Sequence, residues 1–179
     1  HVHILVIGGG AIGTSLAYHL ARDGARDVLL VEKAQLTHGC TWHAAGLVGQ
    51  LRSSASITQV LKYSVELYKK LDAETGLATG WKMTGCLRLA NNENRWIEYK
   101  RLATTAQSFG MEMHLLTPAE VKKMWPLLNI DDLVGASFLP TDGQASPSDI
   151  AQSLAKGARM HGARLIEGAR VTSFDIKDS

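Results

Sequence analysis

The 179-residue sequence has little of what marks several specialised protein classes. Its two cysteines, Cys40 and Cys86, are too few for a disulfide scaffold or a cysteine metal site, and we expect reduced thiols. No apolar run approaches the roughly 20 residues that span a bilayer. Nineteen basic and 17 acidic residues leave a net charge of +2, which gives no electrostatic reason to bind nucleic acid or an anionic membrane. A globular protein without metal, membrane or nucleic-acid partners is therefore expected.

The two ends of the chain suggest part of a longer protein. The sequence starts with His1 and stops in polar residues just after a predicted strand. The apolar stretch at residues 4–7 runs directly into a glycine turn, which is not how a signal peptide is built. With 45% hydrophobic residues, the chain can still form a substantial core. We therefore interpret it as the N-terminal part of a globular protein.

A β-α-β unit is predicted at the start of the chain. Residues 3–7 and 27–31 read as short buried strands, and residues 11–23 between them read as a helix that ends before Gly24. Strands joined by a helix imply a parallel sheet. Its apolar positions recur at helical spacing: Ile12, Leu16 and Leu20.

Further elements alternate along the rest of the chain. The segments Thr117-Pro118-Ala119-Glu120 and Ser146-Pro147-Ser148-Asp149 are helix start signals with proline at the first helical position. The predicted fold class is α/β. Helices are expected at residues 56–71, 93–109, 118–126 and 147–161. Strands are expected at residues 81–90, with an interruption at Gly85, and at 111–116, 133–139, 163–166 and 171–176.

The glycines after the first strand form the pattern of a dinucleotide-binding turn. Gly8 permits the tight turn, Gly10 lets a pyrophosphate approach the backbone, and Gly13 lets the helix pack closely on the sheet. The helix N-terminus then offers unpaired N–H groups to the phosphates. Glu32 ends the second strand 19 residues after Gly13, where the fingerprint expects a carboxylate for the ribose hydroxyls. This pattern leaves NAD and FAD both open.

The loop that follows points to a flavin. Its sequence, Gly39-Cys40-Thr41-Trp42-His43-Ala44-Ala45-Gly46-Leu47, resembles the flavin-attachment loop of the dimethylglycine dehydrogenase and sarcosine dehydrogenase family. These are flavoenzymes with the D-amino-acid-oxidase type of fold. Family loops commonly have Ser or Thr where this chain has Cys40. The resemblance covers essentially the whole chain and continues at residues 74–76, 80–81, 98–102, 126–129 and 142–143.

The resemblance implies FAD bound covalently through His43, at the 8α-methyl carbon of the flavin. A neutral imidazole nitrogen is a competent nucleophile for this bond. The small residues Ala44 to Gly46 would let the backbone approach the ring. The expected cofactor-binding residues are Gly8, Gly10, Ala11, Ile12, Gly13, Glu32, Lys33, Thr41, Trp42, His43, Ala45, Gly46, Leu47 and Val171.

The resemblance also implies a domain plan and a reaction. Residues 1–80 would begin an FAD-binding Rossmann-like domain, residues 81–140 a substrate domain with a mixed or antiparallel sheet, and residues 141–179 would return to the first. The reaction would be oxidative N-demethylation of sarcosine or dimethylglycine, with hydride transfer from the N-methyl carbon to the flavin. Arg52 is a candidate for binding the substrate carboxylate, although a solvated or structural arginine is the more ordinary reading.

Partners and alternatives follow from the same resemblance. An electron-transfer flavoprotein would accept the electrons. Tetrahydrofolate would bind only the full-length protein. The protein would lie in the cytoplasm if its source is bacterial and in the mitochondrial matrix if its source is eukaryotic. One alternative is a non-catalytic relative like the regulatory subunit of pyruvate dehydrogenase phosphatase, which lacks the attachment motif; the intact Trp42-His43 pair argues against it. The other is an amine oxidase that uses oxygen. The fragment alone is expected to be inactive.

Overall fold

A computed structural model describes residues 1–175 and divides the chain into two compact units. Unit 1 consists of residues 1–46, 67–81 and the chain from residue 145 onward. Unit 2 consists of residues 47–66 and 82–144. Helix α2 (Ala55–Thr75) contributes its first part to unit 2 and its second part to unit 1. The structure therefore groups residues 47–66 with the second unit, whereas the sequence plan counted them within residues 1–80.

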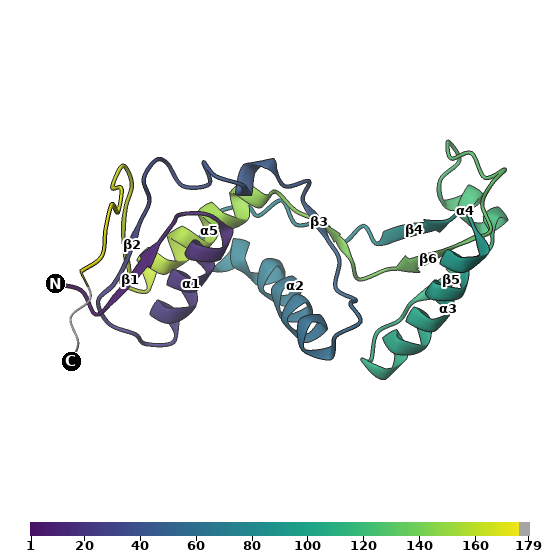
Figure 1. Cartoon of the computed structure of the whole chain (residues 1–179), viewed down its shortest axis with the longest axis horizontal. Helices are drawn as coiled ribbons and strands as arrows, with labels where there is room; N and C mark the ends of the chain where they lie inside the picture. Colours follow the sequence, from purple (N-terminus) through teal and green to yellow (C-terminus); the bar gives the residue numbers. More distant parts are fainter. Residues whose placement is uncertain (176–179) are drawn as a thin grey trace. The chain divides into compact units, whose positions relative to one another are not determined.

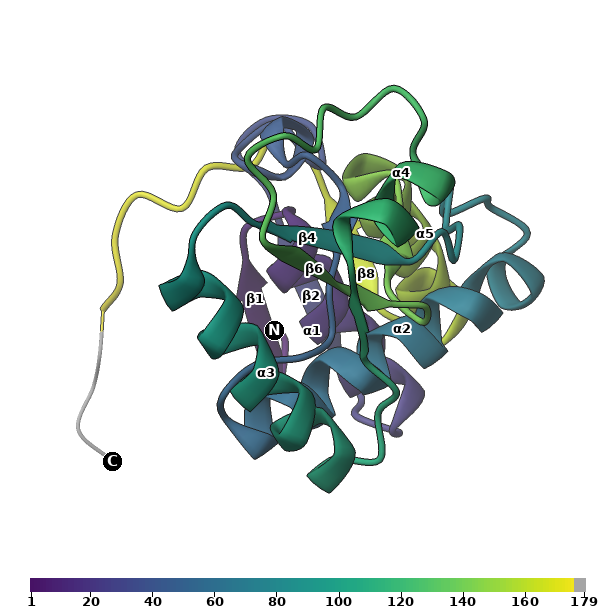
Figure 2. The ribbon, with the colours of Figure 1, turned by 90° about the vertical axis from the view of Figure 1, so that its right-hand side faces the viewer.

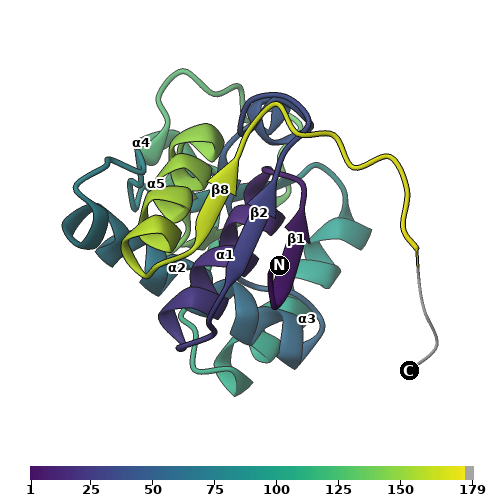
Figure 3. The ribbon, with the colours of Figure 1, turned by 90° about the vertical axis from the view of Figure 1, so that its left-hand side faces the viewer.

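Unit 1 contains a parallel sheet with helices on one face. Strands β1 (Ile4–Ile7), β2 (Val28–Val31) and β8 (Arg164–Ile166) lie in the order β1-β2-β8, with both pairs parallel. Helices α1 (Ala11–Arg22) and α5 (Pro147–Met160) pack against each other behind this sheet, as Figure 3 shows. The predicted β-α-β unit is confirmed, and it places the glycine turn at the carboxyl end of β1.

Helix α1 buries a different face from the one that its large apolar residues suggested. Ile12 is 87% exposed and Leu16 is 48% exposed, whereas the buried positions are Thr14, Ala17, Tyr18 and Ala21. The helical spacing of Ile12 and Leu16 therefore does not mark the buried face, and both residues line the cavity at the start of α1. The contact with α5 explains the difference, because two helices that pack closely select small residues, and α5 offers buried Ala155 and Ala158 there.

Unit 2 is built on an antiparallel sheet. Strands β4 (Cys86–Ala90), β6 (Gly135–Leu139) and β5 (His114–Leu116) lie in the order β4-β6-β5, and β4 and β6 run side by side in Figures 1 and 2. Its core cluster is small and centres on four buried residues. These are Leu51, Ala106, Met111 and Leu139. The predicted α/β class with an antiparallel second sheet is confirmed.

The remaining elements of unit 2 frame this sheet. Helix α3 (Glu93–Ser108) lies against β4, β5 and β6, and helix α4 (Pro118–Met124) lies against β6. A two-stranded antiparallel pair, β3 (Leu47–Val48) with β7 (Gly143–Gln144), was not foreseen. Two-residue strands carry too little pattern to be recognised in a sequence.

One strand prediction holds only in part, and another needs correction. The strand expected at residues 81–90 is interrupted at Gly85, as predicted, because Gly85 adopts a φ of +74° and its N–H donates to the Asp142 carbonyl; β4 begins after it, at Cys86. The strand expected at residues 171–176 is not formed over residues 171–175, and Ile176 lies outside the described residues. Both predicted helix starts are confirmed: Thr117 and Glu120 form a complete capping box, and Ser146 caps α5.

Candidate dinucleotide-binding site

The glycine turn joins β1 to α1 through backbone geometry that glycine allows. Gly8 has a φ of +106°, and its N–H donates to the carbonyl oxygen of Val31 at 2.8 Å. A side chain at Gly13 would overlap the carbonyl oxygen of Gly8. The first turn of α1 therefore packs directly on the turn, as the fingerprint requires.

Glu32 braces this turn from the end of β2. Its Oε2 accepts a hydrogen bond from the Gly9 N–H at 2.7 Å, and its Oε1 accepts one from the Ala34 N–H at 2.9 Å. The Gly9 bond is the main reason that the pKa of Glu32 lies below its ordinary value. A carboxylate has about four acceptor sites, so two bonds to the backbone leave capacity for ribose hydroxyls.

An open cavity of about 570 Å³ lies at the N-terminus of α1. Gly10 is the N-cap and has no side chain to satisfy the first helical N–H groups, which have no partner within the helix. Thr41 bounds the cavity, and its Oγ1 accepts the Ala11 N–H at 2.9 Å. The cavity is lined by Leu5, Val6, Ile7, Gly8, Gly10, Ala11, Ile12, Gly13, Leu16, Cys40 and Thr41.

A second cavity, of about 180 Å³, shares Ile7 and Gly8 with the first. It brings Val171, which is far away in the sequence, next to Glu32 and Lys33. Arg170, which the sequence did not single out, lines the same space. The residues present fit a dinucleotide: a helix end for the pyrophosphate, with a carboxylate and two cationic side chains beside it.

The Trp-His segment forms a short 3₁₀ turn, η1 (Thr41–His43), that lies against α5. The rings of Trp42 and His43 lie against each other in a tilted arrangement, with centroids 3.7 Å apart and planes at 33°. The Trp42 Nε1–H donates to the His38 carbonyl at 3.2 Å, and both side chains are exposed. His43 is thus presented on an ordered turn rather than buried in a core.

The three residues that lead away from this turn, Ala45 to Leu47, differ in exposure and in their backbone contacts. Ala45 is exposed, and Gly46 has a φ of +75° at a point where a side chain would overlap the Ala145 carbonyl. Leu47 is exposed and pairs with Gln144 in unit 2. A glycine is therefore needed at position 46 for the path of the backbone itself, whether or not a ligand approaches this loop.

Arg52, the predicted carboxylate ligand, belongs to unit 2. Its backbone N–H donates to Thr58 Oγ1 at 3.1 Å, and its Nη1 donates to the Leu51 carbonyl at 2.8 Å. Its side chain is exposed. Within residues 1–175 there is no group of three or more His, Cys, Asp or Glu arranged to hold a metal ion, and no helix is long and apolar enough to cross a bilayer.

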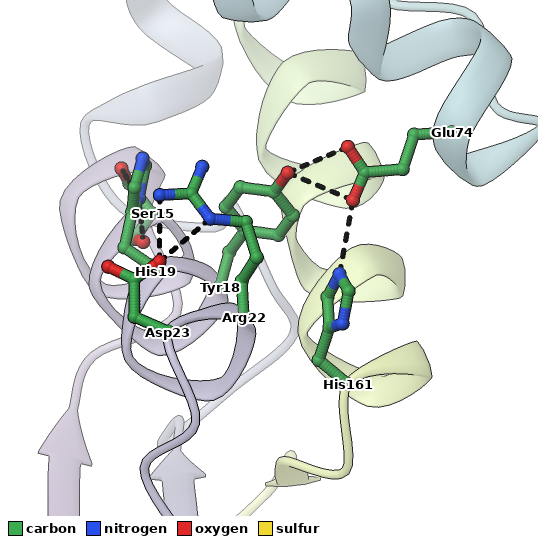
Figure 4. A network of polar contacts seen from close by, with 7 residues as sticks. All are labelled: Ser15, Tyr18, His19, Arg22, Asp23, Glu74 and His161. Carbon is green, nitrogen blue, oxygen red and sulfur yellow. Dashed lines mark hydrogen bonds and ion pairs between the residues drawn. The ribbon is translucent and has the colours of Figure 1, made fainter.

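Behind the site, a polar network ties the helices of unit 1 together (Figure 4). The Tyr18 hydroxyl lies 2.9 and 2.7 Å from the two carboxylate oxygens of Glu74, and His161 Nε2 lies 3.2 Å from the same carboxylate. Burial and the Glu74 carboxylate raise the pKa of Tyr18 to about 12. Arg22 lies over the Tyr18 ring at 5.4 Å. The network joins α1, α2 and the end of α5.

Comparison with known proteins places these features in a family. The family model for FAD dependent oxidoreductases, DAO, matches residues 3–179. Mouse mitochondrial sarcosine dehydrogenase is 41% identical over 176 residues, and human mitochondrial dimethylglycine dehydrogenase is 41% identical over 173. These alignments cover 98% and 97% of this chain but only 19% and 20% of the relatives, so the chain spans about a fifth of their length.

A solved structure supports the same assignment. The L-proline dehydrogenase of P. horikoshii matches with a TM-score of 0.89 and 34% identity, over 99% of this chain and 46% of that chain. The glycine turn, the braced Glu32 and the cavity at the end of α1 are the features that such a family needs to hold FAD. The chain therefore belongs to the DAO family of FAD dependent oxidoreductases.

Proposed function

We propose that the complete polypeptide containing this sequence oxidises an N-methylated glycine, sarcosine or dimethylglycine, with FAD held covalently on His43. One observation carries the proposal: the hydrogen bond from the Ala11 N–H to Thr41 Oγ1. It joins the helix end suited to the pyrophosphate to the turn that carries His43, two residues further on. The names of the mouse and human relatives supply the substrate class.

The chain's own residues would bind the adenine half of FAD through the backbone. The N–H groups at the start of α1 would hold the pyrophosphate beside Gly10. Glu32, already ionised and fixed by Gly9 and Ala34, would accept hydrogen bonds from the ribose hydroxyls. Lys33 and Val171 line the cavity next to it. Bound FAD supplies the hydride acceptor for oxidation of a carbon next to nitrogen.

His43 would provide the covalent bond through a neutral ring nitrogen. Its exposure leaves an imidazole nitrogen accessible, while the adjacent Trp42 ring limits how far the side chain can swing. A neutral imidazole at such a position can act as a nucleophile. Attachment would hold the flavin without depending on pyrophosphate affinity alone.

The electron acceptor and the setting complete the proposal. We infer an electron-transfer flavoprotein as the acceptor and tetrahydrofolate as the acceptor of the one-carbon unit in the complete polypeptide. The relatives are mitochondrial by name, and a mitochondrial matrix location is proposed if the source is eukaryotic, a cytoplasmic one if it is bacterial. Rapid mixing of the reduced enzyme with oxygen would reveal an oxidase by fast reoxidation.

The decisive experiment replaces His43 with Ala in the complete polypeptide. Wild type should keep flavin fluorescence on the denatured chain in a gel, and the variant should release its flavin. Turnover of sarcosine should fall even in saturating FAD, because an unattached flavin is expected to be a weaker oxidant. The neighbouring His38→Ala variant is the matched control. Fluorescence that stays on the His43→Ala chain would show that another residue is the attachment point.

A further inference from the structure

The loop that carries His43 begins beside the glycine turn and holds one strained residue. Thr37 has a φ of +69°, in the left-handed region. Among residues 1–175, the one other non-glycine residue with a positive φ is Asp27, a residue type that tolerates this conformation. Threonine is branched at Cβ, so the same conformation is strained at Thr37. Strain of this kind persists only where neighbouring contacts impose it.

Contacts on both sides of Thr37 impose its conformation. Its own N–H donates to the Gly9 carbonyl at 2.9 Å. The preceding residue, Leu36, is buried, and a side chain on Gly9 would overlap it. The Leu36 N–H donates to Oε1 of Glu167 at 2.6 Å, across 131 residues of sequence. Glu167 therefore reaches from the chain after β8 and fixes the backbone at the start of the loop.

The contacts continue along residues 36–43, which we call the His43 loop. The Trp42 Nε1–H donates to the His38 carbonyl at 3.2 Å, and the Trp42 ring lies against the His43 ring. Because His38 follows Thr37 directly, a change in the Thr37 backbone would move the carbonyl that holds Trp42. The position of the His43 ring therefore depends on a series of contacts that starts at Leu36.

We propose that Glu167 is a positioning residue for the attachment of FAD at His43. Its carboxylate accepts a charge-assisted hydrogen bond, which is stronger than a neutral one. This bond holds Leu36, and with it the strained Thr37, so that the His43 loop keeps one conformation before the cofactor bonds. Without it, Thr37 relaxes out of the left-handed region and His43 loses the support of Trp42. The inference rests on the proposed function for the attachment at His43.

The bond that this loop positions forms with a defined balance. A ring nitrogen of His43 replaces one hydrogen on the 8α-methyl carbon of the flavin. One C–H bond and one N–H bond break and a C–N bond forms. The two protons and two electrons released are taken up, by way of the flavin ring, by dissolved oxygen, which becomes hydrogen peroxide. Glu167 takes no part in these steps and acts on their rate by restricting the positions of the His43 ring.

The test measures covalent attachment in the complete polypeptide. Protein made without flavin is mixed with saturating FAD, and the flavin that stays on the denatured chain is followed over time by in-gel fluorescence. Glu167→Ala should slow attachment about tenfold or more, as expected for the loss of a charge-assisted hydrogen bond. Glu167→Gln keeps an oxygen acceptor and should recover part of the rate. In the His43→Ala background, where this bond cannot form, the affinity for FAD should be the same with and without Glu167→Ala.

A second variant tests the strain at Thr37. Asparagine adopts the left-handed conformation more readily than threonine, so Thr37→Asn should attach FAD at the wild-type rate and have an equal or higher Tm. If Glu167 acts by restraining this strain, Glu167→Ala should slow attachment less in the Thr37→Asn background than in wild type. An equal loss of rate in both backgrounds would show that Glu167 does not act through Thr37.

The matched control is Asp23→Ala. It removes another exposed carboxylate of unit 1, which pairs with Arg22 at 2.9 Å at the C-terminal end of α1. This variant should attach FAD at the wild-type rate, because Asp23 lies at the opposite end of α1 from the glycine turn. If Glu167→Ala loses FAD affinity and attachment together, with a lowered Tm, Glu167 only supports the fold and the positioning role is wrong.

Two outcomes overturn different statements. If wild type gains covalent flavin and Glu167→Ala gains it at the same rate, the positioning inference is wrong and the proposed function stands. If wild type gains none, the proposed attachment at His43 is wrong. Hydrogen exchange without FAD then decides whether Glu167 holds the loop: the amides of residues 36–43 should exchange faster in Glu167→Ala than in wild type, and equal exchange would refute the inference.

Discussion

The two units of this chain use opposite means to build their sites. In unit 1 the backbone forms most of the site: a glycine turn, the N-terminus of α1 and N–H groups bonded to Glu32 shape the cavity. In unit 2 a side chain fixes the backbone instead: the buried Asp142 carboxylate accepts the Gln50 N–H and lies 4.0 Å from the Arg88 guanidinium. A backbone site needs glycines at fixed spacing, whereas a side-chain site depends on long-range contacts. The first kind therefore leaves a readable signature and the second does not.

The largest expected effect tests the difference between the two cores. Leu30 in unit 1 and Leu139 in unit 2 are both fully buried, but the first sits in an extensive cluster and the second in a small one with partly buried neighbours. Leu30→Ala should cost about 4 kcal/mol of unfolding free energy and Leu139→Ala about 3, since a looser site can collapse further. Denaturant titration measures both, and a larger loss for Leu139→Ala would contradict the comparison.

The next effect concerns the glycine turn of unit 1. Gly13→Ala should cost about 3 kcal/mol, because the added methyl group would overlap the Gly8 carbonyl and push α1 off the turn. FAD content per polypeptide should fall with it. Gly39→Ala is the control, since a Cβ there meets nothing within 4 Å. Equal stability and flavin content in the two variants would mean that close packing at Gly13 is not required.

The third effect compares the hydrogen bonds made by the hydroxyl groups of two buried tyrosines, Tyr18 in unit 1 and Tyr99 in unit 2. Tyr18→Phe removes short bonds to the Glu74 carboxylate and should cost about 2 kcal/mol, whereas Tyr99→Phe removes one 3.3 Å bond to the Leu89 carbonyl and should cost less than about 1. Because the folded pKa of Tyr18 is raised to about 12, its contribution is complete below pH 10 and is lost as pH rises toward 12. Thermal melts from pH 8 to 11 check both points, and parallel pH curves for wild type and Tyr18→Phe would refute the assignment.

The smallest effect concerns acid stability. The pKa of Glu32 is lowered in the folded state, chiefly by the Gly9 N–H, so its contribution is present above about pH 4.5 and is lost as pH falls below that value. Glu32→Gln should lower stability at pH 7 by about 1 kcal/mol and flatten the loss toward acid. Glu120→Gln, at the capping box of α4, supplies the comparison from unit 2. An unchanged acid slope in Glu32→Gln would show that this carboxylate does not brace the turn.

The sequence by itself determined the elements whose signals are local. The Gly8 to Gly13 spacing predicted the turn between β1 and α1, and the Thr117 and Ser146 start signals predicted α4 and α5, because caps and tight turns depend on a few neighbouring residues. The strand ends were less well defined, since pairing with β6 decides where a strand such as β5 begins.

Tertiary structure alone decided which surfaces are buried and which distant residues meet. It turned Tyr18 and the small residues of α1 toward α5 and left Ile12 and Leu16 outside, although hydrophobicity pointed the other way. It also brought Asp142 to Gln50 across 92 residues. Helical periodicity cannot foresee the close approach of a second helix, and no local pattern records a contact between residues so far apart. That is why the dinucleotide turn was visible in the sequence and the contact between Asp142 and Gln50 was not.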